Sequence, residues 1–198
     1  MDKYRAPMTM KKLKFGESLV RKQKIDFIKN KVIELNNINT PIIEVGVYKG
    51  GTAKVIIENM NKICDLYLFD TFEGIPNKSE CDNIHIVGDF NDSSYKNILE
   101  LFKSYRNVYI YKGIFPDETS KFINNIMFKI VHLDVDTYIS YKKSLEFLYD
   151  RVIKRGYIIF DDYNEKTCRG ATIAIDEFFK YKKEKIMLYD KSYYIVKQ

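Results

Sequence analysis

The sequence predicts an α/β fold in which a mostly parallel β-sheet is covered by helices on both faces. Short apolar runs alternate along the chain with stripes of apolar residues at helical spacing, and the alternation repeats five times. The runs are almost continuously apolar, which is typical of strands buried on both faces. A glycine cluster follows the first run, where the pattern changes from strand to helix. These observations predict βα units with a ligand site at the carboxyl ends of the strands.

The expected elements follow in order from the N-terminus. Residues 1–19 are basic and irregular, and residues 20–36 have the apolar spacing of a helix. Strands are then expected over residues 42–44, 65–70, 107–114, 129–135 and 157–160. Helical stripes begin at residue 52 and cover residues 95–102, 122–127, 145–153, where Gly156 is expected to stop the helix, and 171–179. Only a short turn separates residues 185–188 from residues 193–196, so these runs are expected to pair antiparallel at one sheet edge.

Composition limits the class of protein. The chain has 198 residues, 45% of them hydrophobic, and no apolar run long enough to cross a bilayer. We therefore expect one soluble globular domain over residues 1–198, with residues 1–37 as an N-terminal cap. The absence of an apolar signal region, and of any pairing or metal-ligand spacing among Cys64, Cys81 and Cys168, favours the cytoplasm. The lysines behind the net charge of +6 are scattered, which favours a solvated surface over a nucleic-acid footprint.

The stretch IIEVGVYKGGTA, residues 42–53, is a candidate cofactor site. Glycines let the backbone approach a ligand closely, and the following helix offers unpaired N–H groups at its N-terminus. The spacing E-x-G-x-x-x-G-G matches neither the dinucleotide fingerprint nor the phosphate loop. Glu44 repels phosphate and favours a cofactor with an amine or hydroxyls, such as S-adenosylmethionine (SAM). The alternative is a structural turn in some other α/β protein.

Acidic residues end four of the predicted strands: Glu44, Asp70, Asp134, Asp136, Asp161 and Asp162. A single acid in such a position is more often a helix cap or a turn former. Six acids around one crevice raise one another's pKa and cost stability unless a cation compensates. Asp134, Asp161 and Asp162 therefore predict three oxygen ligands for a hard divalent ion such as Mg²⁺.

A resemblance to a known family rests on five stretches: IIEVGVYKGGTA, LYLFDTFEGIP, YKGIFPDET, VHLDVDTYISYKKSLEFLYDRV and GYIIFDDYNEKTCRGATIAIDEF. Over residues 7–179 the chain resembles the macrocin O-methyltransferase family of class I SAM-dependent methyltransferases. The H-L-D-x-D…D-D-Y combination is the most specific part. The resemblance implies a Rossmann-like, seven-stranded sheet of order 3-2-1-4-5-7-6, SAM above the first two strands, and a divalent metal that positions a sugar hydroxyl.

The resemblance also implies roles for individual residues. Asp70 falls at the position that holds the cofactor's ribose, and Thr9 and Met10 match an N-terminal Thr-Met that lies against the cofactor. The implied metal ligands are Asp134, Asp161 and Asp162. The expected cofactor-binding residues are Thr9, Met10, Glu44, Gly46, Tyr48, Gly50, Asp70, Thr71, Phe72 and Gly113.

The sequence departs from the family at Val45 and Tyr48, where the family more usually has Thr or Cys and Trp. Its N-terminal part is short and residues 77–86 are compact, and in the family these regions help to build the lid over the acceptor. Three alternatives stay open: a catechol-type O-methyltransferase, because a catechol also presents a diol; an RNA methyltransferase, which would fit the basic charge; and a non-enzymatic SAM-binding protein. The RNA alternative is disfavoured because residues 161–164, DDYN, lack the Pro-Pro-aromatic motif of base-amine methylation.

The expected reaction is direct methyl transfer to an oxygen. A metal would bind one or two vicinal hydroxyls, and Asp134 or Asp136 would take the proton. His132 is expected to be a satisfied core histidine rather than a partner of the metal ligands. The expected acceptor is a small-molecule or glycan hydroxyl, on a glycan, glycolipid, natural product or nucleotide sugar, without nucleic acid, with a homo-oligomer left open. Flat faces for a sugar ring are expected from Tyr48, Phe72, Tyr138 and Tyr163.

Overall fold

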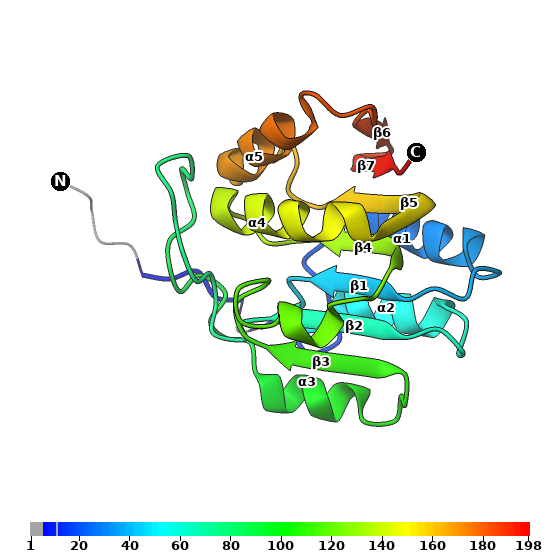
Figure 1. The fold of residues 1–198 in the computed structure, drawn as a ribbon. Coiled ribbons are helices and arrows are strands. Elements are labelled where there is room, and N and C mark those ends of the chain that lie inside the picture. Colours follow the sequence, from blue (N-terminus) through cyan, green and yellow to red (C-terminus); the bar gives the residue numbers. More distant parts are fainter. Residues whose placement is uncertain (1–5, 11) are drawn as a thin grey trace.

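The computed structural model describes residues 6–10 and 12–198 of this protein. One seven-stranded sheet forms its centre, with the order β3-β2-β1-β4-β5-β7-β6 (Figure 1). The strands are β1 (Ile42–Val45), β2 (Leu66–Asp70), β3 (Val108–Lys112), β4 (Phe128–Leu133), β5 (Val152–Phe160), β6 (Met187–Tyr189) and β7 (Ser192–Val196). Strands β1 to β5 run parallel, and β7 pairs antiparallel with both β5 and β6. The predicted strand order and terminal hairpin are confirmed.

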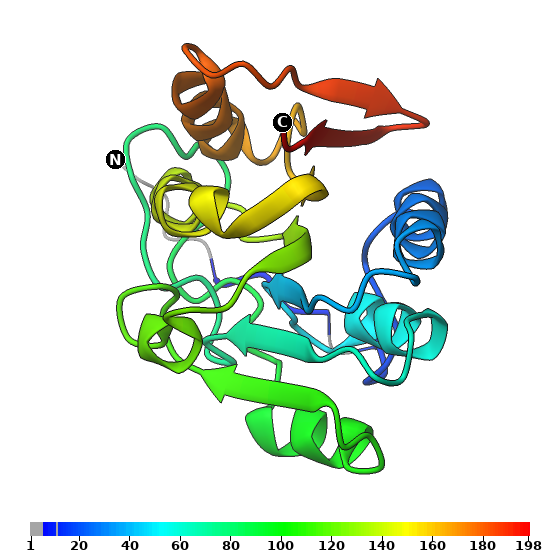
Figure 2. The ribbon, with the colours of Figure 1, turned by 45° about the vertical axis from the view of Figure 1, so that its right-hand side comes forward.

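Helices cover both faces of the sheet (Figures 1 and 2). One face carries α4 (Tyr138–Leu148), α5 (Arg169–Phe179) and the 3₁₀ helix η1 (Ser120–Ile123), and the other carries α1 (Lys22–Glu34), α2 (Gly51–Asn59) and α3 (Tyr95–Phe102). All four residues of β1 are buried. Ile43 belongs to the core under α4 and α5, and Ile42 to the core under α1 and α2. Burial on both faces of the sheet therefore explains why the strands are continuously apolar, as the sequence predicted.

The prediction of a helix over residues 145–153 is wrong at its C-terminal end. Helix α4 stops at Leu148, the 3₁₀ helix η2 (Tyr149–Arg151) follows, and Val152 already begins β5. Phe128 pairs with Val152 but Ile130 pairs with Tyr157, so residues 153–156 lie opposite a single residue of β4. This bulge, with Arg155 at φ +64°, places Gly156 inside the strand instead of at the end of a helix.

The N-terminal segment lies beside the loop that follows β2. The backbone N–H of Phe90 donates to the carbonyl of Met8 at 2.6 Å, and the N–H of Met8 donates to Asp89 Oδ1 at 2.5 Å. Both segments are at the edge of the sheet where the parallel strands end. Within the part of the chain that the structure describes, no helix has the length and apolar character that a membrane span requires.

Candidate active site

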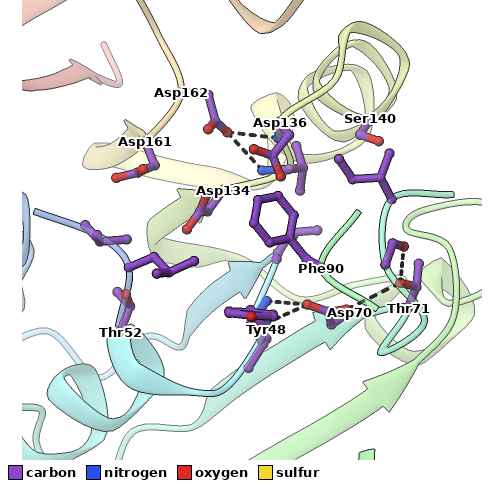
Figure 3. A pocket seen from close by; sticks show the side chains of 18 of the residues that line it. Tyr48, Thr52, Asp70, Thr71, Phe90, Asp134, Asp136, Ser140, Asp161 and Asp162 are labelled. Carbon is purple, nitrogen blue, oxygen red and sulfur yellow. Dashed lines mark hydrogen bonds between the residues drawn. The ribbon is translucent and has the colours of Figure 1, made fainter. Parts of the chain in front are cut away.

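A cavity of about 370 Å³ opens at the carboxyl ends of the parallel strands. It lies where the strand order reverses, between β1 and β4, which is the usual ligand position in open α/β sheets. Its volume is in the range of small-molecule sites. The wall includes the ends of β1, β2, β4 and β5, the N-terminal residues Met8 and Met10, and Phe90 from the loop after β2 (Figure 3).

Asp70 holds the glycine turn in shape. Its Oδ2 accepts hydrogen bonds from the backbone N–H groups of Val47 and Tyr48, both at 2.7 Å. Its Oδ1 accepts one from the N–H of Phe72 at 2.6 Å. Burial raises the pKa of Asp70, and these three donors act against the rise. Because each carboxylate oxygen can accept more than one hydrogen bond, Asp70 keeps capacity for a ligand in the cavity.

Gly46 lets the end of β1 approach the end of β4. Its φ is +90°, and a Cβ built there would lie 1.7 Å from the carbonyl oxygen of Asp134. A Cβ at Gly51, the first residue of α2, would lie 2.3 Å from the backbone of residues 17 and 18. Only glycine allows both approaches. The glycines therefore bring β4 and the N-terminal segment against the turn that carries Asp70's partners.

Asp134, Asp161 and Asp162 meet at the ends of β4 and β5 (Figure 3). One oxygen from each carboxylate lies within 4.8 Å of the others. The Oδ2 of Asp162 is fixed by the hydroxyl of Tyr141 at 2.8 Å and by the N–H of Asp136 at 3.0 Å. Among the described residues, the buried Oδ1 of Asp161 finds no hydrogen-bond donor. An unsatisfied buried oxygen is costly, and a cation held by these three carboxylates would satisfy it.

Asp134 and Asp161 of this cluster, and Asp136 beside it, have raised pKa values. Burial, and after it the charge of Asp161, raises the pKa of Asp134 well above its ordinary value. Burial, and after it Asp162, raises the pKa of Asp161 and that of Asp136. Gathered carboxylates in a poorly solvated site have this effect on one another.

Lys24, from α1, is one cation already beside the cluster. Its Nζ lies 3.6 Å from Asp161 Oδ1 and 2.9 Å from Glu165 Oε1, and it donates to the backbone carbonyl of Asp161. Burial acts to lower the pKa of Lys24, but Asp161 and Glu165 outweigh it and the pKa is raised. The side chain therefore stays charged and offsets part of the negative charge of the cluster.

Glu44 is buried and does not line the cavity. The side chain is 1% exposed, and its Oε1 is 3.0 Å from Nδ1 of His132, its register partner on β4. Burial raises the pKa of Glu44, and the contact with His132 opposes the rise. Among the described residues, Glu44 Oε2 and His132 Nε2 have no hydrogen-bond partner. The expected core histidine is thus satisfied on one nitrogen only.

Most of the residues that the sequence singled out line this one cavity. Those in the wall are Met10, Gly46, Tyr48, Asp70, Thr71, Gly113, Asp134, Asp136, Asp161 and Asp162. Four expected cofactor residues are not in the wall: Thr9, Glu44, Gly50 and Phe72. Phe72 is 5% exposed and packs on the ring of Tyr95. Of the four aromatic residues expected to face a sugar, only Tyr48 lines the cavity.

Sequence reasoning missed a buried network that links the N-terminal segment to the glycine turn. Lys49, 3% exposed, bonds to Asp92 Oδ2 at 2.7 Å and to the carbonyl of Met10 at 2.8 Å. Asp92 Oδ1 accepts the hydroxyl of Tyr48 at 2.8 Å. Lys49 is one of many lysines in the sequence, so nothing in its local pattern identifies it as a buried, paired residue.

The sheet order and the site together define a Rossmann-like class I methyltransferase. The sequence model of the macrocin-O-methyltransferase (TylF) family matches residues 2–189. The chain therefore belongs to the TylF family and is a SAM-dependent O-methyltransferase. No curated protein matches its sequence significantly.

Solved structures share this fold. The O-methyltransferase NovP superimposes with a TM-score of 0.74 at 23% identity, over 89% of this chain and 80% of NovP. The calicheamicin methyltransferase CalS11 gives a TM-score of 0.74 at 17% identity, over 87% of this chain and 76% of CalS11. An O-methyltransferase from Bacillus cereus in complex with SAH gives 0.59 at 14% identity, over 90% of this chain and 82% of that chain. At these identities the likeness shows a shared fold.

Proposed function

We propose that this enzyme methylates a hydroxyl of a sugar that carries a neighbouring hydroxyl, with a divalent metal ion as helper. The observation that carries the proposal is the convergence of Asp134, Asp161 and Asp162; among the described residues Asp161 Oδ1 accepts no hydrogen bond, and its neighbouring cation, Lys24 Nζ, lies 3.6 Å away. The family supports O-methylation. A sugar acceptor is supported by CalS11, which is a TDP-rhamnose 3′-O-methyltransferase.

The cavity has the features that SAM requires. Asp70 presents acceptor oxygens for the hydroxyls of a ribose, and Gly46 allows the end of β4 to lie against the turn that Asp70 holds. Gly113, Thr71 and Met10 also line the cavity. SAM supplies an activated methyl group, so the chain's own task is to hold donor and acceptor in line and to exclude water.

The three-carboxylate cluster fits a hard divalent ion such as Mg²⁺, which supplies Lewis acidity to bound hydroxyls. Asp162 is oriented by Tyr141 and by two backbone N–H groups, so its second oxygen is presented in a fixed direction. Because such an ion prefers several oxygen ligands, a vicinal diol is the acceptor that matches it best with little ordering cost.

Asp136 is the proton acceptor in this proposal. It lines the cavity but is not one of the three clustered ligands. Its backbone N–H donates to Asp162 Oδ2, which fixes the residue at φ +58° next to the cluster. Burial, followed by the charge of Asp162, raises the pKa of Asp136 and so makes it a stronger base than an exposed aspartate.

The metal assignment is tested with Asp161→Asn, which keeps the shape of the side chain and removes its charge. We expect the methylation rate to fall by about three orders of magnitude, since several kcal/mol of transition-state stabilisation are lost. SAM affinity by calorimetry should stay nearly unchanged. Asp150→Asn, at an exposed acid in η2, is the matched control and should retain the rate. Full activity of the natural sequence in excess EDTA would refute the metal assignment.

The acceptor class is tested by mass spectrometry on a panel of nucleotide sugars and glycans with SAM and Mg²⁺. We expect methylation of sugars with a vicinal diol, and a loss of orders of magnitude for the matching deoxysugar that lacks the neighbouring hydroxyl. Efficient turnover of simple catechols, with none of any sugar, would assign the catechol alternative instead.

A further inference from the structure

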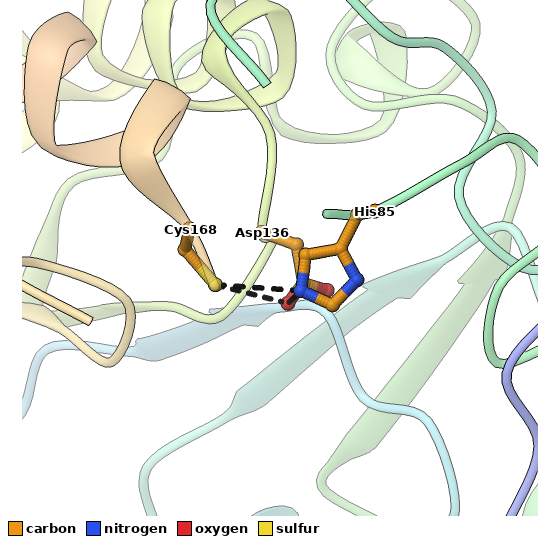
Figure 4. A group of neighbouring side chains, drawn as sticks. All are labelled: His85, Asp136 and Cys168. Carbon is orange, nitrogen blue, oxygen red and sulfur yellow. Dashed lines mark hydrogen bonds and ion pairs between the residues drawn. The ribbon is translucent and has the colours of Figure 1, made fainter. Parts of the chain in front are cut away.

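A second cluster of metal-ligand atoms is shown in Figure 4, and it adjoins the three-carboxylate site at Asp162. It brings together His85 from the loop after β2, Asp136 from the loop after β4, and Cys168 at the start of α5. His85 Nε2 is 3.4 Å from Asp136 Oδ1 and 3.5 Å from Cys168 Sγ, and Cys168 Sγ is 3.6 Å from Asp136 Oδ1. One nitrogen, one oxygen and one sulfur thus form a nearly equilateral triangle.

The sides of this triangle match tetrahedral coordination of a zinc-class ion. With usual bond lengths of about 2.0–2.1 Å to nitrogen, 2.0–2.2 Å to oxygen and 2.3 Å to sulfur, tetrahedral angles separate the ligand atoms by about 3.4 Å for N–O and about 3.6 Å for N–S and S–O. The observed separations agree with each of these three values. At these separations one position lies within bonding distance of all three atoms.

The surroundings of His85 support the same assignment. Its other ring nitrogen, Nδ1, lies 3.2 Å from Oδ2 of Asp89, which is 0% exposed. Histidines that bind metals are usually oriented by a carboxylate on the second nitrogen in this way. His85 and Cys168 are each 4% exposed and line the cavity, so an ion can reach them from inside it.

We propose that His85, Asp136 and Cys168 form a site for a zinc-class ion, separate from the Mg²⁺-type site of Asp134, Asp161 and Asp162. Thiolate and imidazole ligands select borderline ions such as Zn²⁺, Co²⁺ and Cu²⁺, whereas an all-carboxylate set suits Mg²⁺. Three protein ligands leave the fourth position open to the cavity. When the ion binds, the Cys168 thiol gives up its proton to solvent and a sulfur–metal bond forms.

An ion at the second site is expected to inhibit the reaction that depends on the first site. Asp162 Oδ1 is 3.5 Å from Cys168 Sγ, so the sites adjoin. An ion at the second site occupies the carboxylate of Asp136. On the proposed function, which this consequence rests on, Asp136 is the proton acceptor, so a zinc-class ion acts as an inhibitor even when Mg²⁺ is saturating.

Binding is tested without any activity assay by adding Co²⁺ to the purified, metal-free protein. A thiolate ligand gives a sulfur-to-cobalt charge-transfer absorption in the near ultraviolet. We expect this absorption in the natural sequence, its loss in Cys168→Ser, and its retention in Cys64→Ser and Cys81→Ser, which remove the other two thiols. Zn²⁺ should displace Co²⁺ and abolish the absorption.

Two further variants keep the test decisive if Cys168→Ser folds poorly. His85→Gln removes one ligand and is expected to weaken Co²⁺ binding at least tenfold, while Asp161→Asn, outside the cluster, is expected to leave it within about threefold. Absence of the absorption, or its persistence in Cys168→Ser, would overturn the site. If the spectra appear but Zn²⁺ does not slow Mg²⁺-supported methylation, the site stands and its inhibitory role is overturned.

Discussion

Gly46 lies where no side chain has room. Gly46→Ala would bring a Cβ to 1.7 Å from the carbonyl oxygen of Asp134, so the end of β4 has to shift. We expect methylation to fall by about a hundredfold, because a displacement of about 1 Å at reacting groups has that effect. Steady-state rates at saturating SAM and Mg²⁺ measure the loss.

Gly16→Ala is the control that separates the effect of the steric collision at Gly46 from the effect of a positive φ. Gly16 has a similar φ of +87°, but a Cβ placed there would have a lysine side-chain carbon as its nearest neighbour, at 3.4 Å. We expect the variant to lose about 1–3 kcal/mol of stability through strain alone and to keep its methylation rate within a factor of a few. Equal rate losses in the two variants would contradict the steric account of Gly46.

Asp70 holds the glycine turn and, on the proposed function, also binds the ribose of SAM, so its removal should affect both stability and affinity. Asp70→Ala leaves the N–H groups of Val47, Tyr48 and Phe72 without their acceptor. We expect SAM affinity to fall more than tenfold and the free energy of unfolding to fall by about 1–3 kcal/mol. Calorimetry and chemical denaturation measure the two. Asp65→Ala, just before the other end of β2, is the control and should leave SAM affinity unchanged within about twofold.

At the scale of elements, Asp92 fastens the N-terminal segment to the glycine turn. Burial acts to raise the pKa of Asp92, but hydrogen bonds from Lys49 and Tyr48 outweigh it and hold the pKa below its ordinary value. The folded state therefore favours the charged carboxylate. This contribution to stability is present above about pH 4 and is lost as pH falls through the lowered pKa.

Asp92→Asn is expected to lower the free energy of unfolding at pH 7 by about 3 kcal/mol, because Lys49 is left buried without its partner. The difference from the natural sequence should stay constant above about pH 5 and narrow as the pH falls from about 4 toward about 2, which thermal melts across both ranges can show. Glu58→Gln breaks an exposed pair with Lys54 and should cost less than about 0.5 kcal/mol at any pH. A pH-independent difference for Asp92→Asn would contradict the electrostatic explanation.

For the whole molecule, the proposed metal site predicts stabilisation by Mg²⁺. An ion that binds only the folded state contributes about 2.7 kcal/mol at a hundred times its dissociation constant. For a chain of this size that is a rise in melting temperature of roughly 5–10 °C. Differential scanning calorimetry with EDTA or with Mg²⁺ measures it. Asp161→Asn should show little of this rise, and an equal rise in both proteins would place the ion elsewhere.

Strand β5 shows the limit of reading a pattern locally. Val152 and Ile153 follow Leu145 and Leu148 at a spacing that suits a helix, and no local signal ends the helix before them. In the structure, Val152 pairs with Phe128 across the sheet. Whether an apolar pair belongs to a helix or to a strand is decided here by the neighbouring strand, which the local period does not contain.

The sequence by itself determined the class of sheet and the edge of the sheet that carries the cavity. It also determined that Asp70, Asp134, Asp161 and Asp162 lie at that edge. These follow because the residues next to the ends of apolar strands meet at one edge whenever the strands are parallel. Only the tertiary structure decided which polar residues pair. Glu44 contacts His132 inside the core, and Lys49 forms an ion pair with Asp92. Cys168 contacts His85, which is 83 residues away from it in the sequence. Such pairings depend on how separate loops come together in space, and no spacing along the chain records that.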